Sequence, residues 1–263
     1  MVIPQQKSDG TAEAGRSPGG LVIERACRTE EGACRHLLVW RCGPGWRLLG
    51  SAVLGGGLGE REWVVNAQVR PGYSRMDPEQ HLAELAAAER LRGAGAGLMT
   101  AAQVDDFTWA CDGGASAVVT TGIGVPIWAA EPETAPAYAY VPGTINILVV
   151  VPAAVSDAGL VNLLATATEA KVQALLDAGY DCSGTPSDAV CVAVRRTGAG
   201  EEPEPFGGPR SLWGARVARA VHAAVRAGAE TDRARRARGP APEHARPMQD
   251  CRRSFVLSVD QLP

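Results

Sequence analysis

Residues 144–151, TINILVVV, form the strongest signal of a buried strand in the chain. A short continuous run of apolar and β-branched residues is typical of a strand that is covered on both faces. Residues 157–178 follow with the apolar spacing of a helix that ends at Gly179, and 188–195 have the pattern of another strand. The sequence therefore predicts a strand, a long helix and a strand in the second half of the chain.

The remaining elements are predicted in the same way. A helix is expected to begin with Asp77 as N-cap and Pro78 at the first helical position, and another covers 211–227. Further strands are expected at 36–40, 46–54, 63–69, 98–102 and 115–121. Strands thus come in adjacent pairs among about three long helices. We predict a single domain of mixed α/β (α+β) class with largely antiparallel strands.

Composition limits the class of protein. With 263 residues, 46% hydrophobic and 21% charged, the chain is long enough for one large soluble domain. We expect residues 1–35 to be a largely disordered extension, 36–227 to be the domain and 228–263 to be a flexible arginine-rich tail. A net charge of −3 argues against a general nucleic-acid binder. Neither a signal-type apolar core nor a membrane-span pattern is present, so we expect a cytoplasmic protein. The pattern does not indicate an oligomeric state.

Metal and disulfide chemistry is not expected. The seven cysteines are an odd number without a C-x-x-C pair, which favours small buried thiols over a zinc site or a disulfide framework. The four histidines have no ligand spacing, and residues 114–118 lack the second glycine of a nucleophile elbow. The LGGGLG segment opens into a strand, so it is neither a P-loop nor a dinucleotide fingerprint.

Residues 51–69, SAVLGGGLGEREWVVNAQV, contain a candidate binding wall. The three glycines Gly55, Gly56 and Gly57 allow positive φ and close approach of a ligand to the backbone. Asn66 and Gln68 are two residues apart and so lie on one face of a strand. This combination suits a ligand rich in amides, and it equally suits a glycine-rich hairpin turn with two solvated polar residues.

Lys171 is the only lysine in the presumed fold, since the other lysine is Lys7. At 100° per residue it falls on the apolar face of its helix, whereas Glu169 lies on the opposite face. A lysine there must either extend its ammonium to water or meet a carboxylate in a site. Asp188, at the junction of a loop and an apolar strand, is either a turn residue or an acid/base group.

Several motifs occur in the order typical of one family. They are Ser51–Gly57 (SAVLGGG) followed by Val65-Asn66, Met99–Ala102 (MTAA), Gly143–Ile147 (GTINI), Thr166–Lys171 (TATEAK) and Ser187–Val190 (SDAV). On this ordered set, over roughly residues 40–226, the chain resembles the adenosylcobinamide amidohydrolase family.

The resemblance implies hydrolysis of the amide that joins aminopropanol to adenosylcobinamide, giving adenosylcobyric acid for cobalamin salvage or remodelling. The partner is then a small-molecule corrinoid, and no cofactor is expected because the corrinoid is the substrate. Its amide arms would be held by the glycine loop and by polar side chains, and its corrin face by Trp63 or Trp109. The polar side chains are Asn66, Gln68, Thr144 and Asn146.

The mechanism stays open between several assignments. We expect Glu169 or Asp188 as general base, with Lys171 or the amides of Gly55–Gly57 stabilising the oxyanion. A second hypothesis is an enzyme that cuts itself between Gly143 and Thr144 and uses Thr144 as an N-terminal nucleophile. The non-enzyme alternative is a corrinoid-binding carrier.

Overall fold

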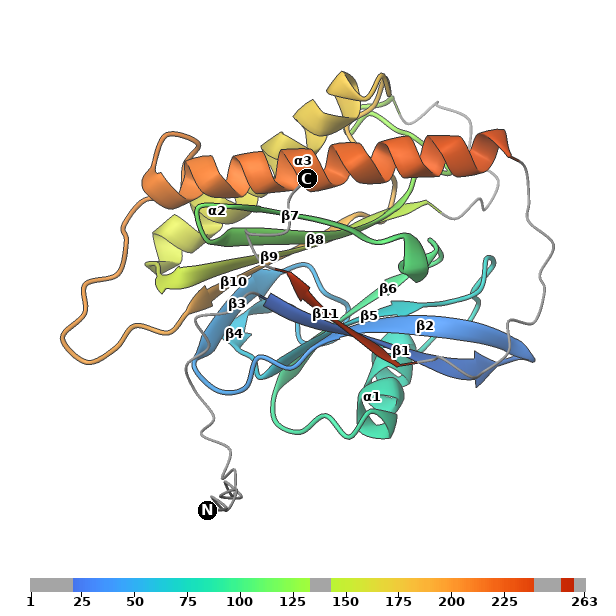
Figure 1. The fold of residues 1–263 in the computed structure, drawn as a ribbon, viewed down its shortest axis with the longest axis horizontal. Helices are drawn as coiled ribbons and strands as arrows, with labels where there is room; N and C mark the ends of the chain where they lie inside the picture. The colour runs from blue at the N-terminus through green and yellow to red at the C-terminus, as the bar shows by residue number, and fades with distance from the viewer. Residues whose placement is uncertain (1–20, 133–142, 239–251, 258–263) are drawn as a thin grey trace, which may run out of the picture.

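The computed structural model describes residues 21–132, 143–238 and 252–257. Two β-sheets stack face to face, with helix α1 on the outer face of one sheet and helices α2 and α3 on the outer face of the other (Figure 1). The chain is therefore a four-layer sandwich of helix, sheet, sheet and helices. The predicted mixed α+β class in a single domain is confirmed.

The first sheet has five strands in the order β11-β1-β2-β5-β6. Their bounds are β1 Leu21–Glu30, β2 Ala33–Trp40, β5 Trp63–Gln68, β6 Gly95–Thr100 and β11 Arg253–Leu257. All neighbours are antiparallel except β5 and β6, which are parallel and joined through α1 (Pro78–Ala88). A short 3₁₀ helix, η1 (Val104–Asp106), follows β6.

The second sheet has six strands in the order β4-β3-β10-β9-β8-β7. Their bounds are β3 Trp46–Gly50, β4 Gly57–Glu60, β7 Thr108–Asp112, β8 Ala115–Gly122, β9 Thr144–Ala154 and β10 Ala189–Arg195. Strands β9 and β10 are parallel and are joined through α2 (Asp157–Asp177). The run TINILVVV lies in β9, where Thr144–Val151 are all buried, as its continuous apolar pattern predicts.

Helix starts follow local chemistry. The Ser156 hydroxyl accepts a hydrogen bond from Gly159 N (3.1 Å) at the start of α2. Pro78 occupies the first turn of α1 as predicted, but the Asp77 side chain makes no capping bond. Arg75 holds that carboxylate instead, with Nε 2.9 Å from Oδ1, so Asp77 stabilises the approach to the helix rather than its first amide.

The helix α3 (Leu212–Ala237) ends ten residues later than the predicted end at residue 227. Asp232 is fully buried on α3 and accepts hydrogen bonds from Ile123 N (3.3 Å) and from Arg236 Nε (2.6 Å). Arg236, which the sequence placed in a solvated tail, therefore neutralises the buried carboxylate of Asp232. Through Ile123 N, this carboxylate connects α3 to the end of β8. The expected domain boundary at residue 227 is wrong for this reason.

The amino-terminal boundary at residue 36 is also too late. Strands β1 and β2 begin at Leu21 and Ala33, and β1 pairs on one side with β2 and on the other with β11. Strands β1 and β11, which lie next to each other at one edge of the sheet, both come from segments expected to be disordered or flexible, because their mixed charge hides the strand period. The described part of residues 228–263 also contains strand β11. Residues 131–143, whose proline and alanine content predicts a surface loop, fall mostly outside the described residues.

Most of the described cysteines are free thiols. Cys27 is disulfide-bonded, against expectation, whereas Cys34, Cys42, Cys111, Cys182 and Cys191 are free. Burial raises the pKa of the Cys191 thiol to about 12, in keeping with an inert core residue.

Across the described ranges, no helix has both the length and the apolar character needed to cross a membrane.

Candidate active site

A cleft of about 520 Å³ opens between the two sheets. It lies where β5 and β6 end and where β9 and β10 begin. The wall combines small and large apolar side chains with a few polar groups, as ligand sites usually do. Its lining residues are Ser51, Val53, Val69, Arg70, Gly72, Tyr73, Leu98–Ala101, Val125, Gly143, Thr144, Asn146 and Pro186–Ala189.

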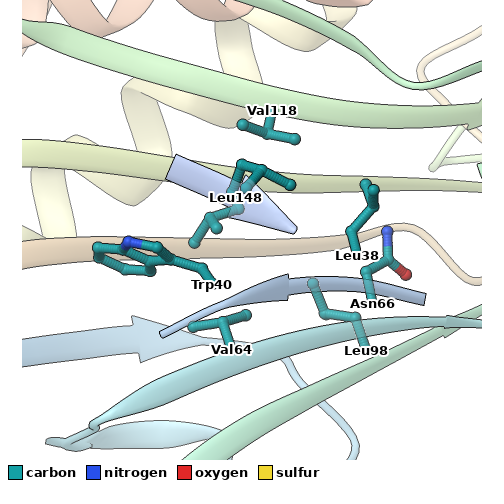
Figure 2. Close-up of a pocket in the computed structure, with 8 residues that line it drawn as sticks. Leu38, Trp40, Val64, Asn66, Leu98, Val118 and Leu148 are labelled. Atoms are coloured by element: carbon teal, nitrogen blue, oxygen red, sulfur yellow. The ribbon is translucent and has the colours of Figure 1, made fainter. Parts of the chain in front are cut away.

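The inter-sheet core behind the cleft is apolar and closely packed. Figure 2 shows Trp40, Val64, Leu98 and the facing residues of β8 and β9 around a cavity of only about 20 Å³. Asn66 is the one amide among the labelled side chains. The space between the sheets therefore changes from hydrocarbon to hydrogen-bonding groups at Asn66, toward the cleft.

A buried amide network connects the sheets at that point. Asn146 Nδ2 donates to Asn66 Oδ1 (2.9 Å) and to Met99 O (3.0 Å), while Asn66 Nδ2 donates to Thr120 Oγ1 (2.9 Å). Asn146 is 2% exposed and lines the cleft, and its Oδ1 has no hydrogen-bond partner among the described residues. An unpaired buried carbonyl is unfavourable, so this oxygen is a ready acceptor for an N–H group of a ligand.

Gln68 has a structural role, because its side chain bonds other protein groups. It shares the face of Asn66, as predicted, but its Oε1 accepts from His36 N (3.4 Å) and its Nε2 donates to Gln103 Oε1 (3.2 Å). It does not line the cleft. The predicted binding role is therefore not supported by its position.

Lys171 meets a carboxylate rather than water. Its Nζ lies 2.6 Å from Asp188 Oδ2, and both side chains are 9% exposed. Gly184 packs directly on this ion pair, since a Cβ at that position would lie 2.6 Å from the ammonium. The sequence placed Lys171 correctly on a buried face, and the fold supplies the partner from the loop before β10.

Asp188 lines the cleft but is fully hydrogen-bonded. Ile145 N (2.9 Å) and Thr185 Oγ1 donate to its Oδ1, and Lys171 Nζ and Thr185 N (3.1 Å) donate to its Oδ2. A carboxylate has about four lone-pair sites, and all are occupied here. Asp188 could take a proton from a nucleophile only by giving up one of these bonds. Its geometry is that of a group that holds the 184–188 loop against the start of β9.

Glu169 is not brought into this site. It is exposed on α2 and is absent from the cleft lining, with its face directed away from Lys171 as the helical wheel predicted. Of the two candidates for the general base, Glu169 and Asp188, only Asp188 lines the cleft.

In the glycine loop, Gly55 and Gly56 pack against protein, whereas Gly57 is exposed. Gly55 and Gly57 have φ of +62° and +75° and require glycine. Arg61 donates from Nε and Nη2 to Gly55 O (2.9 and 2.7 Å) and from Nη2 to Gly56 O (3.3 Å), and Gly55 lies against the backbone of Gly95. Gly55–Gly57 do not line the cleft, so their position does not support the predicted substrate wall; of residues 51–69, Ser51, Val53 and Val69 line it.

Two hydroxyls meet at the opposite wall. Thr144 Oγ1 lies 2.7 Å from Ser187 Oγ, and Ser187 Oγ donates to Gly143 O (3.0 Å). Thr144 was predicted as a binding residue and does line the cleft, whereas Ser187 was passed over as part of a motif. Adjacency to Asp188 in the SDAV motif was the signal that could have identified it.

Tyr73 and His81 form a second proton-bearing pair. Tyr73 lines the cleft, and its hydroxyl lies 3.0 Å from His81 Nδ1 with the rings stacked. Burial lowers the pKa of His81 and raises the pKa of Tyr73, so both side chains are neutral near pH 7. Among the described residues, no group of three or more histidine, cysteine or acidic side chains is placed to hold a metal ion.

Comparison with known proteins agrees with the resemblance in the sequence. A family profile described as adenosylcobinamide amidohydrolase matches residues 22–237. The chain is 31% identical over 186 residues to an adenosylcobinamide amidohydrolase of Methanosarcina mazei, covering 68% of this chain and 88% of that protein. It is 44% identical over 87 residues to an adenosylcobinamide amidohydrolase of Halobacterium salinarum, covering 33% and 36%. A crystal structure of a Pyrococcus horikoshii protein matches with a TM-score of 0.45 at 10% identity, covering 80% of this chain and 84% of that chain.

Proposed function

The chain belongs to the adenosylcobinamide amidohydrolase family, and on that premise we propose that it hydrolyses the amide between aminopropanol and the corrin side chain of adenosylcobinamide. The products are adenosylcobyric acid and aminopropanol. This reaction lets a cell salvage or remodel incomplete corrinoids.

The unpaired Oδ1 of Asn146 is the structural observation that carries the proposal. A corrinoid presents several propionamide and acetamide arms, each with N–H donors. One such arm placed in the cleft completes the hydrogen bonding of Asn146, whose two N–H groups are already used by Asn66 and Met99. Loss of that bond would leave a buried acceptor without a partner, so the site discriminates for amides.

Apolar side chains of the cleft suit the flank of the macrocycle. Val53, Met99 and Pro186 line it, together with the ring of Tyr73. Trp63 and Trp109, which we expected to contact the corrin, lie elsewhere: Trp63 is 7% exposed and packs on Gly95, and Trp109 packs in the inter-sheet core. A cleft of about 520 Å³ accommodates an edge of the corrinoid with its arm rather than the whole ligand.

Amide hydrolysis needs a nucleophile, a donor for the oxyanion and a proton for the leaving amine. Thr144 and Ser187 supply the hydroxyls that face the cleft. Lys171 and Asp188 position the loop that carries Ser187, since Asp188 bonds both Thr185 and the backbone of Ile145. Glu169 has no part in this assignment.

The proposal includes no resident cofactor and no nucleic-acid partner, because the corrinoid is itself the substrate and the net charge is −3. It assigns the reaction to the cytoplasm. Dialysis against a chelator followed by an activity assay tests the first point, and cell fractionation tests the last.

The decisive experiment incubates the purified protein with adenosylcobinamide and measures released aminopropanol together with the mass of the corrinoid product. Release of aminopropanol with formation of a carboxylate on the corrinoid supports the proposal. Tight binding without release favours the carrier alternative instead. Asn146→Leu is the site variant, for which we expect at least about tenfold lower kcat/KM. Glu169→Gln is the matched surface control, with activity within about twofold of the wild type.

A further inference from the structure

The peptide bond between Gly143 and Thr144 lies in the wall of the cleft. Both residues are buried and line it, and Thr144 is the first residue of β9. Gly143 is held tightly, because a Cβ there would lie 3.0 Å from Gly124 N and 3.1 Å from Val125 N. A side chain there would crowd the backbone of Gly124 and Val125, so this peptide packs closely against that segment.

The Ser187 hydroxyl connects the two ends of that peptide. Ser187 Oγ donates its proton to Gly143 O at 3.0 Å, so the short contact of 2.7 Å between Ser187 Oγ and Thr144 Oγ1 uses the proton of Thr144. The hydrogen bonds therefore run from the Thr144 hydroxyl to Ser187 and from Ser187 to the carbonyl of Gly143. This path leads from a nucleophile to the oxygen of the carbonyl next to it.

The described part of the cleft offers few groups that could act as a base on a substrate. Its lining includes no histidine, and its one carboxylate is Asp188, whose lone-pair sites are occupied. An α-amine at Thr144 would lie beside the Thr144 hydroxyl itself. Such an amine has an ordinary pKa near 8 and serves as the base for its own hydroxyl in N-terminal nucleophile enzymes.

From this geometry we infer that the chain cuts itself between Gly143 and Thr144, and that Thr144 is then the nucleophile of the amide hydrolysis. In the first step Thr144 Oγ1 attacks the Gly143 carbonyl carbon. The Thr144 proton passes to Ser187, and the Ser187 proton passes to the Gly143 oxygen. The C–N bond breaks as this proton moves to the nitrogen, leaving an ester and a free amine. Water then hydrolyses the ester to the Gly143 carboxylate and the Thr144 hydroxyl.

Turnover repeats the chemistry on the substrate and rests on the proposed function. Thr144 Oγ1 attacks the aminopropanol amide carbonyl while the Thr144 amine takes its proton. That proton passes to the leaving amine, so aminopropanol departs and a corrinoid acyl ester remains on Thr144. Water hydrolyses this ester to adenosylcobyric acid, and the hydroxyl is restored.

The test is the intact mass and the N-terminal sequence of the purified full-length protein. We expect two associated chains, 1–143 and 144–263, the second beginning with Thr144. Thr144→Ala abolishes scission and turnover, and Thr144→Ser retains both. Ser187→Ala slows scission by about a hundredfold or more, since it removes the donor to the developing oxyanion. Thr231→Ala is the control, because that hydroxyl donates to Ala227 O within α3, away from the cleft, and this variant is expected to cut itself at the wild-type rate.

A single intact chain in a preparation that releases aminopropanol at full rate overturns the inference while the proposed function stands. Activity of Thr144→Ala likewise overturns it. Scission at Gly143 without aminopropanol release supports self-processing and instead overturns the proposed function. If Thr144→Ala does not fold by circular dichroism, the wild-type mass and the Ser187→Ala rate decide.

Discussion

Asp188→Asn is expected to destabilise the protein strongly. The Lys171 ammonium, 2.6 Å from Asp188 Oδ2 on a side chain that is 9% exposed, would lose its counter-charge. The NH₂ group of the new amide would also face a backbone N–H that now donates to the carboxylate, that of Thr185 or that of Ile145, so two donors would face each other. Removing one partner of a buried pair costs about 3–5 kcal/mol, and we expect the upper part of that range.

The reverse substitution, Lys171→Met, is expected to cost less. Asp188 would keep the bonds from Ile145 N, Thr185 N and Thr185 Oγ1, so three of its four donors remain. We expect a loss of about 2–3 kcal/mol in the free energy of unfolding. The double variant is expected to lose less than the sum of the two by about 1–3 kcal/mol, because both single changes break one interaction.

Urea unfolding at neutral pH, followed by circular dichroism, measures these values, with an unchanged m-value as the condition for comparison. The control is Glu230→Gln in the surface pair with Arg226 (3.2 Å; side chains 57% and 51% exposed). Like Asp188→Asn, this substitution replaces a carboxylate by an amide, and it is expected to lower the free energy of unfolding by under about 0.5 kcal/mol. A loss under about 1 kcal/mol for Asp188→Asn, or additive single effects, would refute the assignment of a coupled buried pair.

Three further outcomes are expected. Asn66→Ala removes the acceptor of one hydrogen bond (2.9 Å) from the Asn146 amide. In steady-state assays we expect KM for adenosylcobinamide to rise about tenfold and kcat at saturation to stay within about twofold. An unchanged KM contradicts this. Gly184→Ala places a methyl group on the Lys171 ammonium and lowers the free energy of unfolding by about 1–3 kcal/mol in the same urea assay. Burial lowers the pKa of His81 below 6.5, so the unfolded chain binds more protons as pH falls below that value. Stability is then full near pH 7.5 and declines toward pH 5, and a decline that is equally steep in His81→Gln would exclude His81 as its source.

Local chemistry made much of the fold predictable. The run TINILVVV required a buried strand, and the helix after it presents an apolar face that includes Lys171, whose burial the structure confirms. The predicted domain boundaries were wrong where charged residues lie in segments that pack against the domain. The arginines after residue 227 serve a buried Asp232, and β1 and β11 have mixed charge because each is only partly covered.

The candidate site was predictable only in part. Asp188 was identified from its place between a loop and an apolar strand, and Thr144 and Asn146 from the family resemblance; all three line one cleft. Gly55–Gly57 and Gln68 do not line that cleft. The sequence does not distinguish a glycine that approaches a ligand from one that, like Gly55, approaches the protein's own backbone.

Segment 51–69 illustrates the division between sequence and structure. The sequence by itself determined that three glycines make a turn and that Asn66 and Gln68 share a face, because φ preferences and strand period are local properties. Only the tertiary structure decided that Arg61 closes the turn, that Gln68 is used by Gln103, and that Asn66 holds Asn146 at the cleft. The reason is physical: hydrogen-bond partners come from strands about 80 residues apart for Asn66 and Asn146, and their meeting depends on how two sheets stack rather than on any local preference.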